Sequence, residues 1–175
     1  MDELVFHHAA RMPINDKTLI AISDLWTEEY VFESIDPRLR SFFGVHKLFS
    51  MMESGFFRVY GAFDAESRFM GCIFGNLHDD NESFIMHLAF YRNVRVITCM
   101  DGFRDVILAD FARDGVAIKY FVGLIPETHW AAIRLAKRGG MEDRGFCEET
   151  VPGSNGETVR CREFVGKAEV VHGSR

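Results

Sequence analysis

The sequence predicts an α+β fold, with a mixed, mostly antiparallel twisted sheet and helices on both of its faces. The predicted elements follow the order β, α, α, β, β, β, α, β, α, β, β, in which an antiparallel meander precedes a long helix and a strand–helix–strand unit. The chain has 175 residues, of which 47% are hydrophobic and 26% charged, which suits one buried core and is short for two. We therefore expect a single domain over residues 1–166 and a C-terminal tail over 167–175.

The first strand and the first helix are expected close to the N-terminus. Residues 4–9 are predicted as a strand. Asn15 or Asp16 can accept hydrogen bonds from the free amides of a following helix, in which apolar side chains recur at helical spacing. We expect this helix to run to about Ser34. A second helix is expected to begin at Asp36-Pro37, because aspartate suits the N-cap and proline the first helical position, and to be closed by Gly55.

A three-stranded meander is predicted in the middle of the chain. Residues 57–63 and 69–77 are apolar runs on either side of a polar turn over 64–67, so we expect them to pair as a hairpin. A second polar turn over 78–81 leads into a third strand over 83–90. These three strands should be antiparallel to one another.

The C-terminal half is predicted as a long helix followed by strand, helix and two strands. The helix spans about residues 98–114, with Thr98 and Asp101 placed as a variant of the capping box. A strand over 118–125, a helix over 128–138 and two strands over 141–148 and 158–165 follow. Repeats, low-complexity tracts and linkers are not apparent in the sequence, so no second domain is expected.

Composition narrows the classes of function. The formal net charge of -6 does not favour nucleic acid or an anionic membrane as a partner. An apolar run of membrane-spanning length and a signal-peptide pattern are both missing, so we expect a cytosolic protein. The histidines show no metal-ligand spacing, so we expect no metal site. Four widely spaced cysteines predict reduced, mostly buried thiols: Cys72, Cys99, Cys147 and Cys161.

A stretch near the C-terminus resembles a known family. It contains His129, Ala132, Leu135, Ala136 and Gly140-Met141 at the spacing of the motif Asn-x-x-Ala-x-x-Leu-Tyr-x-x-x-Gly-Phe. This is the late motif of the GNAT superfamily of acyl-CoA-dependent N-acyltransferases, and the predicted order of elements is also that of the family. The resemblance implies the GNAT fold, acetyl-CoA as acyl donor, and direct transfer to an amine within a ternary complex.

The family holds the pyrophosphate of acyl-CoA on backbone amides between the fourth strand and the long helix, with the pattern Arg/Gln-x-x-Gly-x-Gly/Ala. In one register Arg92 takes the Arg place, and in the other Arg95 does, with Thr98 and Met100 at the glycine places. Both registers lack glycine, but two arginines could still contact phosphates. The alternative is that both are solvated loop charges. The expected cofactor loop therefore contains Arg92, Asn93, Val94, Arg95 and Thr98.

The resemblance also places the pantetheine arm. In the family the fourth strand splays from the fifth, and its free backbone groups pair with the arm, which here indicates Leu88, Ala89 and Phe90. His129 takes the place of the family's Asn, which hydrogen-bonds the arm, although it could equally be a partly exposed cap residue. The first two helices shape the acceptor pocket in the family, so clustered aromatic residues are either pocket or core: Phe42, Phe43, Phe49, Phe56 and Phe57.

Acyl transfer to an amine needs a base for the amine and an acid for the leaving thiolate. The family's usual acid is the Tyr at the Ala136 place, and alanine has no proton to donate. His87 and Glu82 are the nearest candidates for the base, with His87 favoured because its unperturbed pKa lies near neutrality; a structural role is the alternative for a histidine on a strand. Cys147 has no base near it in the sequence and is expected in the core.

Two functions remain open from the sequence. The first is an N-acetyltransferase that acts on a small-molecule or peptide amine. The second is a GNAT-fold protein that has lost catalysis and serves as a binding or assembly module, as the absent glycines and Ala136 would suggest. A chance match on a different α+β fold is a third possibility. The acceptor and the oligomeric state do not follow from the sequence.

Overall fold

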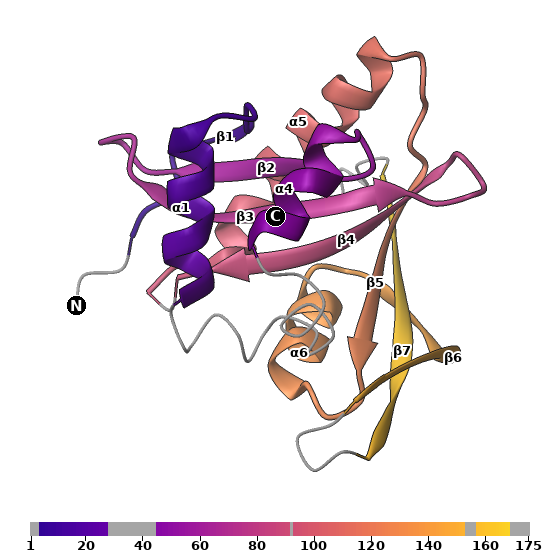
Figure 1. Ribbon diagram of the computed structural model, residues 1–175. Helices are drawn as coiled ribbons and strands as arrows, with labels where there is room; N and C mark the ends of the chain where they lie inside the picture. Colours follow the sequence, from indigo (N-terminus) through magenta and orange to yellow (C-terminus); the bar gives the residue numbers. More distant parts are fainter. Residues whose placement is uncertain (1–3, 28–44, 92, 153–156, 169–175) are drawn as a thin grey trace, which may run out of the picture.

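The computed structural model describes residues 4–27, 45–91, 93–152 and 157–168, which form one mixed sheet flanked by helices (Figure 1). Its strands lie in the order β1-β2-β3-β4-β5-β7-β6, and every neighbouring pair is antiparallel except β4 and β5, which are parallel. The predicted order of elements and the α+β class are confirmed. In chain order the elements are β1 (His8–Arg11), α1 (Asp16–Thr27), α4 (Val45–Glu53), β2 (Arg58–Phe63), β3 (Phe69–Leu77), β4 (Ser83–Phe90), η1 (Val96–Cys99), α5 (Met100–Arg113), β5 (Tyr120–Pro126), α6 (Trp130–Arg138), β6 (Glu142–Pro152) and β7 (Thr158–Lys167).

The helices divide the core between the two faces of the sheet. On one face, α1 and α4 cover Val59, Phe74 and Ala89. On the other, α5 covers Phe84 and Phe121, which lie side by side on β4 and β5. Because side chains alternate between faces, Phe121 shares its face with Gly123 and Ile125, and Ile125 packs against α6. The helices α5 and α6 therefore lie on the same face, over different halves of the sheet.

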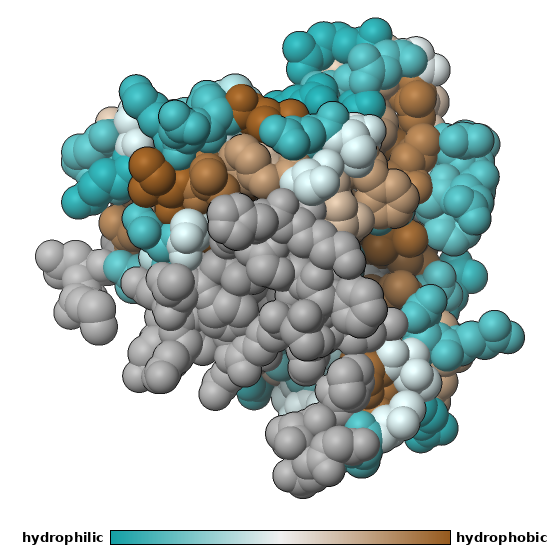
Figure 2. Space-filling model, viewed as in Figure 1, coloured by the Kyte–Doolittle hydropathy of each residue, from teal (hydrophilic) through white to brown (hydrophobic). Residues whose placement is uncertain are grey.

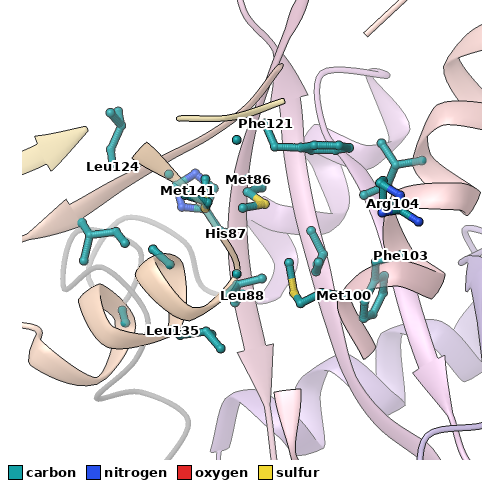
Figure 3. Close-up of a pocket in the computed structure, with 18 of the residues that line it drawn as sticks. Met86, His87, Leu88, Met100, Phe103, Arg104, Phe121, Leu124, Leu135 and Met141 are labelled. Atoms are coloured by element: carbon teal, nitrogen blue, oxygen red, sulfur yellow. The ribbon is translucent and has the colours of Figure 1, made fainter. Parts of the chain in front are cut away.

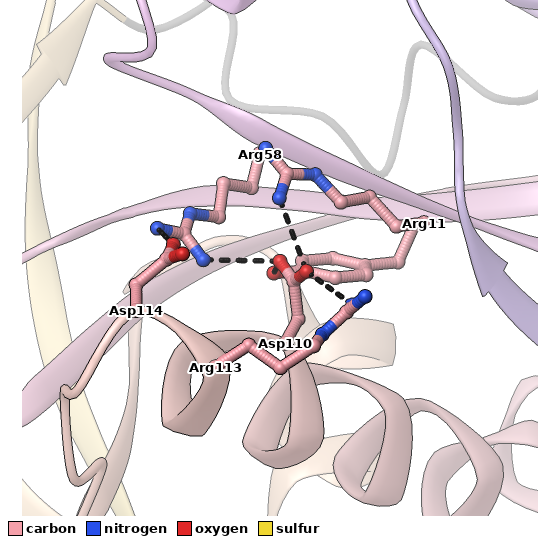
Figure 4. A network of polar contacts seen from close by, with 6 residues as sticks. Arg11, Arg58, Asp110, Arg113 and Asp114 are labelled. Carbon is pink, nitrogen blue, oxygen red and sulfur yellow. Dashed lines mark hydrogen bonds and ion pairs between the residues drawn. The ribbon is translucent and has the colours of Figure 1, made fainter.

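A buried carboxylate ties α5 to the first two strands (Figure 4). Asp110 on α5 is 1% exposed and accepts hydrogen bonds from Arg11 on β1, Arg58 and Tyr60 on β2, and Arg113 on its own helix, at 2.7–3.0 Å. Burial by itself would raise the pKa of Asp110, but these hydrogen bonds and the arginine charges outweigh it and lower the pKa. The same cluster raises the pKa of Tyr60, through burial first and then the hydrogen bond to Asp110.

The predicted N-terminal strand over residues 4–9 is wrong in position. The strand β1 begins at His8 because its partner β2 ends at Phe63, the residue that pairs with His8. Before it, Leu4 makes only an isolated parallel bridge to Val94. The predicted cap of the first helix is confirmed for Asn15, whose side-chain oxygen accepts a hydrogen bond from the amide of Thr18 at 3.1 Å.

The predicted capping role of Thr98 is also wrong. A 3₁₀ turn, η1, precedes α5, so Thr98 lies inside this turn and its hydroxyl donates to the carbonyl of Arg95 at 2.7 Å. The N-cap of α5 is Cys99, which makes no side-chain capping bond. Asp101 lies in the first turn of α5, where its negative charge interacts favourably with the helix dipole.

Other predicted ends move by a few residues. The meander strands and their turns are confirmed, and β5, β6 and β7 run to Pro126, Pro152 and Lys167. The later part of the first predicted helix and the start of the second, over 28–44, lie outside the described residues, as do 169–175. The predicted boundary between domain and tail at 166 stays a prediction. None of the described helices is both long and apolar enough to cross a membrane.

Candidate active site

The central feature is a gap in the middle of the sheet. The parallel strands β4 and β5 pair only where Ser83–Ile85 meets Tyr120–Val122, and then they diverge. Over Met86–Phe90, none of the described strands pairs with the edge of β4 that faces β5. The predicted splay is confirmed.

A glycine lies beside the point of divergence. Gly75 on β3 pairs with Met86, and a Cβ atom at Gly75 would lie 1.9 Å from the carbonyl oxygen of Ile85. Ile85 is the last β4 residue that pairs with β5. The carbonyl of Ile85 therefore leans over β3 at the residue where the two strands part, and only a residue without a side chain leaves room for it.

A cleft of about 200 Å³ follows the gap between α5 and α6 (Figure 3). Its walls are mainly apolar, with Met86 and Leu88 from β4, Met100 and Phe103 from α5, and Leu135 from α6. The titratable side chains at its border are few: His87, Asp101, Arg104, His129 and Lys167. Among the described residues, no three metal-binding side chains cluster together.

The cleft brings together part of the predicted cofactor wall. Leu88 and His129 both border it, from β4 and from the N-cap position of α6. Ala89 and Phe90 lie on the same diverging part of β4, with buried side chains and with β3 on their other edge, where they pair with Cys72 and Gly71.

The predicted phosphate loop leads from β4 through η1 directly into α5. The carbonyl of Asn93 accepts a hydrogen bond from the amide of Leu4 at 3.2 Å, and Val94 is buried beside it. Arg95 and Thr98 are exposed. In the described part of this loop no residue has a positive φ, so it differs from the glycine-rich turn of the family pattern. Arg92 lies outside the described residues.

His87 is held in place by aromatic rings. Its imidazole stacks on Phe74 with ring centroids 5.2 Å apart and meets Phe57 edge-on at 6.3 Å. Both phenylalanines belong to the core under α1 and α4, so the side chain of His87 lies on that face, while its strand borders the cleft. The imidazole of His87 therefore lies on the α1 and α4 face of the sheet, at the gap, and the cleft lies on the α5 and α6 face.

Glu82 lies at the closed end of the gap. Its side chain accepts a hydrogen bond from the ammonium group of Lys119 at 2.5 Å, and it does not border the cleft. Five residues of extended chain separate it from His87, or about 16 Å at 3.3 Å per residue. The sequence therefore named two candidate bases that the fold places far apart.

Ala136 borders the cleft on α6 and is 6% exposed. Cys147 lies elsewhere, on β6, where its thiol donates to the carbonyl of Cys161 at 3.4 Å. Of the aromatic candidates, Phe57 is buried in the core, Phe49 packs against that core and Phe56 is 55% exposed; Phe42 and Phe43 lie outside the described residues. The side chains of Phe49, Phe56 and Phe57 do not border the cleft.

Sequence reasoning missed Arg104 and the glycines of the cleft floor, Gly123 and Gly166. Helical spacing carried a signal for Arg104, which follows Met100 by four residues and precedes Ile107 by three, so all three share one side of α5. The glycines gave no comparable signal, because a glycine within a strand has several explanations.

No family model and no curated protein sequence matches this chain. Solved structures do match its fold. A spermidine N-acetyltransferase from Vibrio cholerae, in complex with CoA and spermine, superposes with a TM-score of 0.70 and 10% identity over 92% of this chain and 96% of that chain. The Salmonella typhimurium acetyltransferase that modifies the N-terminal serine of ribosomal protein L7/L12 gives a TM-score of 0.68 and 14% identity over 91% and 95%.

A ribosomal L7/L12 α-N-protein acetyltransferase in complex with coenzyme A gives a TM-score of 0.67 and 13% identity over 91% of this chain and 92% of that chain. At such identities the likeness establishes the fold alone. It removes the possibility of a different α+β fold. The chain therefore has the fold of the GNAT superfamily of acyl-CoA N-acyltransferases, with a sequence far from these structural neighbours.

Proposed function

We propose that the protein is an acyl-CoA-dependent N-acyltransferase, which moves an acetyl group from acetyl-CoA to an amine. The observation that carries this proposal is the gap between β4 and β5, which are paired over only three residues each. The edge of β4 at Leu88, Ala89 and Phe90 offers backbone donors and acceptors to the amides of a pantetheine arm, much as a sheet edge binds an added strand. The structural neighbours support it, since two of them hold CoA and one also holds the amine spermine.

The phosphates of the cofactor would lie beyond the end of β4. The loop over 93–98 precedes α5, whose N-terminal amides and dipole favour an anion. Arg95 adds an exposed guanidinium there, and Arg92 is the second candidate in the sequence. His129, at the N-cap of α6, borders the opposite wall and is suited to contact the arm. Leu88, Ala89 and Phe90 supply the backbone edge.

The transfer itself breaks one bond and forms one. The amine nitrogen attacks the thioester carbonyl carbon, the carbon–sulfur bond breaks with its electron pair going to sulfur, and an amide forms. One proton leaves the amine, and neutral His87 would accept it directly or through a water. The thiolate takes up a proton from water or from another side chain, because Ala136 supplies none.

A binding or assembly module without catalysis is the second candidate. Two observations favour it: Ala136 stands where the family's acid would be, and the phosphate loop lacks glycine and positive φ. Such a module would bind CoA without releasing free thiol from acetyl-CoA. The cytosolic location expected from composition stays a prediction in either case.

One assay separates the two. Free-thiol release from acetyl-CoA is measured against a panel of polyamines, small amines and peptides with free N-termini, alongside thermal melts with CoA. An enzyme gives amine-dependent release together with a stabilised native state, by about 2.7 kcal/mol at a hundredfold excess of CoA over its Kd. Stabilisation without release for any amine would favour the module. If CoA does not stabilise the protein and no thiol is released, both candidate functions are contradicted.

A further inference from the structure

The cleft has a direction, because it is closed at one end. The strands pair at Ser83–Ile85 and Tyr120–Val122, whereas the expected phosphate loop lies beyond Phe90, at the open end. From Met86 to Phe90 the strand spans roughly 13 Å at about 3.3 Å per residue. A cofactor arm that enters from the loop and follows this edge therefore carries its thioester towards the closed end.

Small residues line the cleft near its closed end. Gly123 and Gly166 form part of its floor, and Ala132 and Ala136 are small residues on the α6 wall. A Cβ atom added at Gly123 would lie at ordinary contact distances of 3.8–4.0 Å from Ile125 and Met141, so these two side chains border the position without filling it. An acetyl group has only one methyl to place there. Because the cleft continues to Phe121 and Ile107 at the closed end, it suits a longer acyl chain.

The walls of this part of the cleft combine apolar groups with one cation. Phe121 and Ile107 are apolar, and Arg104 lies beside Phe121 on the α5 wall (Figure 3). The side chain of Arg104 is 23% exposed and contacts Asp101 at 3.1 Å and Asp105 at 3.0 Å, through carboxylates whose side chains are 87% and 69% exposed.

Asp101 and Asp105 leave some hydrogen-bond donors of Arg104 unused. Ion pairs with exposed carboxylates are weak, because water and salt screen them. The guanidinium has five N–H donors, and its contacts with Asp101 and Asp105 engage three of them, one each on Nε, Nη1 and Nη2. Two donors remain for a planar anion, and guanidinium matches the geometry of a carboxylate.

We propose that the cleft prefers an acyl donor that is longer than acetyl and ends in a carboxylate, such as a succinyl thioester, and that Arg104 binds this carboxylate. This proposal rests on the proposed function. The bonds that break and form are those of acetyl transfer, and the terminal carboxylate takes no part in them.

The test compares three donors: acetyl-CoA, butyryl-CoA and succinyl-CoA, of which the last two have equally long acyl chains and differ in the terminal charge. Thiol release is measured with the best amine of the panel, and an enzyme-free blank removes spontaneous hydrolysis. The wild-type protein should show a kcat/KM for succinyl-CoA at least about tenfold above that for butyryl-CoA, as expected for one charge-assisted contact.

Arg104→Gln should bring this ratio close to one and leave the calorimetric affinity for CoA unchanged. Arg138→Gln, on an exposed position of α6 outside the cleft, is the matched control and should keep the ratio. Gly123→Ala, which adds one methyl to the floor, should lower turnover of both four-carbon donors more than that of acetyl-CoA.

Two results would overturn the proposal while the proposed function stands: a succinyl-to-butyryl ratio near one in the wild-type protein, or a ratio that Arg104→Gln leaves intact. An equal loss for all donors with weaker CoA binding would assign Arg104 to the cofactor and also overturn it. If no acyl-CoA releases thiol and CoA does not bind, the proposed function fails and this proposal fails with it.

Discussion

At the scale of single residues, the chemistry of the cleft depends on a few polar side chains within apolar walls. His87 is the clearest candidate, because two aromatic rings fix its imidazole and its strand borders the gap. A ring held in one orientation loses little freedom when it accepts a proton. The sequence could name His87 but could not show that Glu82, its rival, is engaged by Lys119 at the closed end.

His87→Ala should lower amine-dependent thiol release by about 10²-fold or more, as expected when a general base is lost. His78→Ala, in the exposed turn before β4, is the control and should behave as wild type. An unchanged rate in His87→Ala would remove this residue from the mechanism.

Arg95→Ala should weaken the binding of CoA more than that of a pantetheine fragment without phosphates. The side chain is exposed, so the loss should be modest, on the order of 1 kcal/mol. Calorimetry with both ligands provides the comparison. Equal losses for the two ligands, or no loss for either, would assign Arg95 to another task.

At the scale of elements, the cleft depends on how β4 leaves β5 and on where α5 is held. Gly75 lies beside the first of these features, and Asp110 bears on the second. Gly75 leaves room for the carbonyl of Ile85, and Asp110 binds α5 to β1 and β2. Both residues lie outside the cleft itself, so changes there test the architecture separately from the chemistry.

Gly75→Ala should destabilise the protein by about 3 kcal/mol or more, because its methyl would collide with backbone and not with a flexible side chain. Gly123→Ala is the matched control, since the same methyl meets nothing closer than 3.8 Å there, and it should keep wild-type stability. Urea unfolding of both variants provides the measurement. Equal stabilities would show that the carbonyl of Ile85 does not need the space.

Asp110→Asn should lower the free energy of unfolding by about 3–5 kcal/mol near neutral pH, because three arginines and Tyr60 lose a buried anionic partner. The folded pKa of Asp110 is lowered, so its charge contributes stability above its unfolded pKa of about 3.9, and this contribution is lost as the pH falls towards the folded value. The cost of the variant should therefore shrink in acid.

Urea unfolding across the acidic range measures this trend for the wild-type protein and Asp110→Asn. Asp105→Asn, an exposed position on the same helix, should cost less than about 1 kcal/mol. A cost for Asp110→Asn that stayed constant in acid would mean that the carboxylate is not ionised in the folded protein.

The strength of the local signal decided which elements were predictable. The strands β3 and β4 have clear apolar runs between polar turns, and their bounds were predicted to the residue. The position of β1 depends on where its partner ends, and the cap of α5 depends on a 3₁₀ turn that tertiary packing stabilises, so local pattern misplaced both. Arg104 became a candidate only when the fold placed α5 beside the gap.

At the scale of the whole molecule, a sheet divided by a gap and two helices on one face together form the cleft. The resemblance to the GNAT family predicted the gap between β4 and β5. Its depth could not be predicted, because it depends on small residues from α6, β5 and β7, which converge only in the folded chain: Ala136, Gly123 and Gly166. The chain reaches this architecture with only 10–14% identity to the structural neighbours.

The central claim is that this cleft binds acyl-CoA, and a calorimetric titration with acetyl-CoA tests it most directly. The wild-type protein should bind one molecule per chain. Ala132→Trp, which places a large ring from α6 into the cleft, should abolish the binding, while a thermal melt confirms that the variant is folded. Absence of binding in the wild-type protein, or unchanged binding in a folded Ala132→Trp variant, would contradict the account.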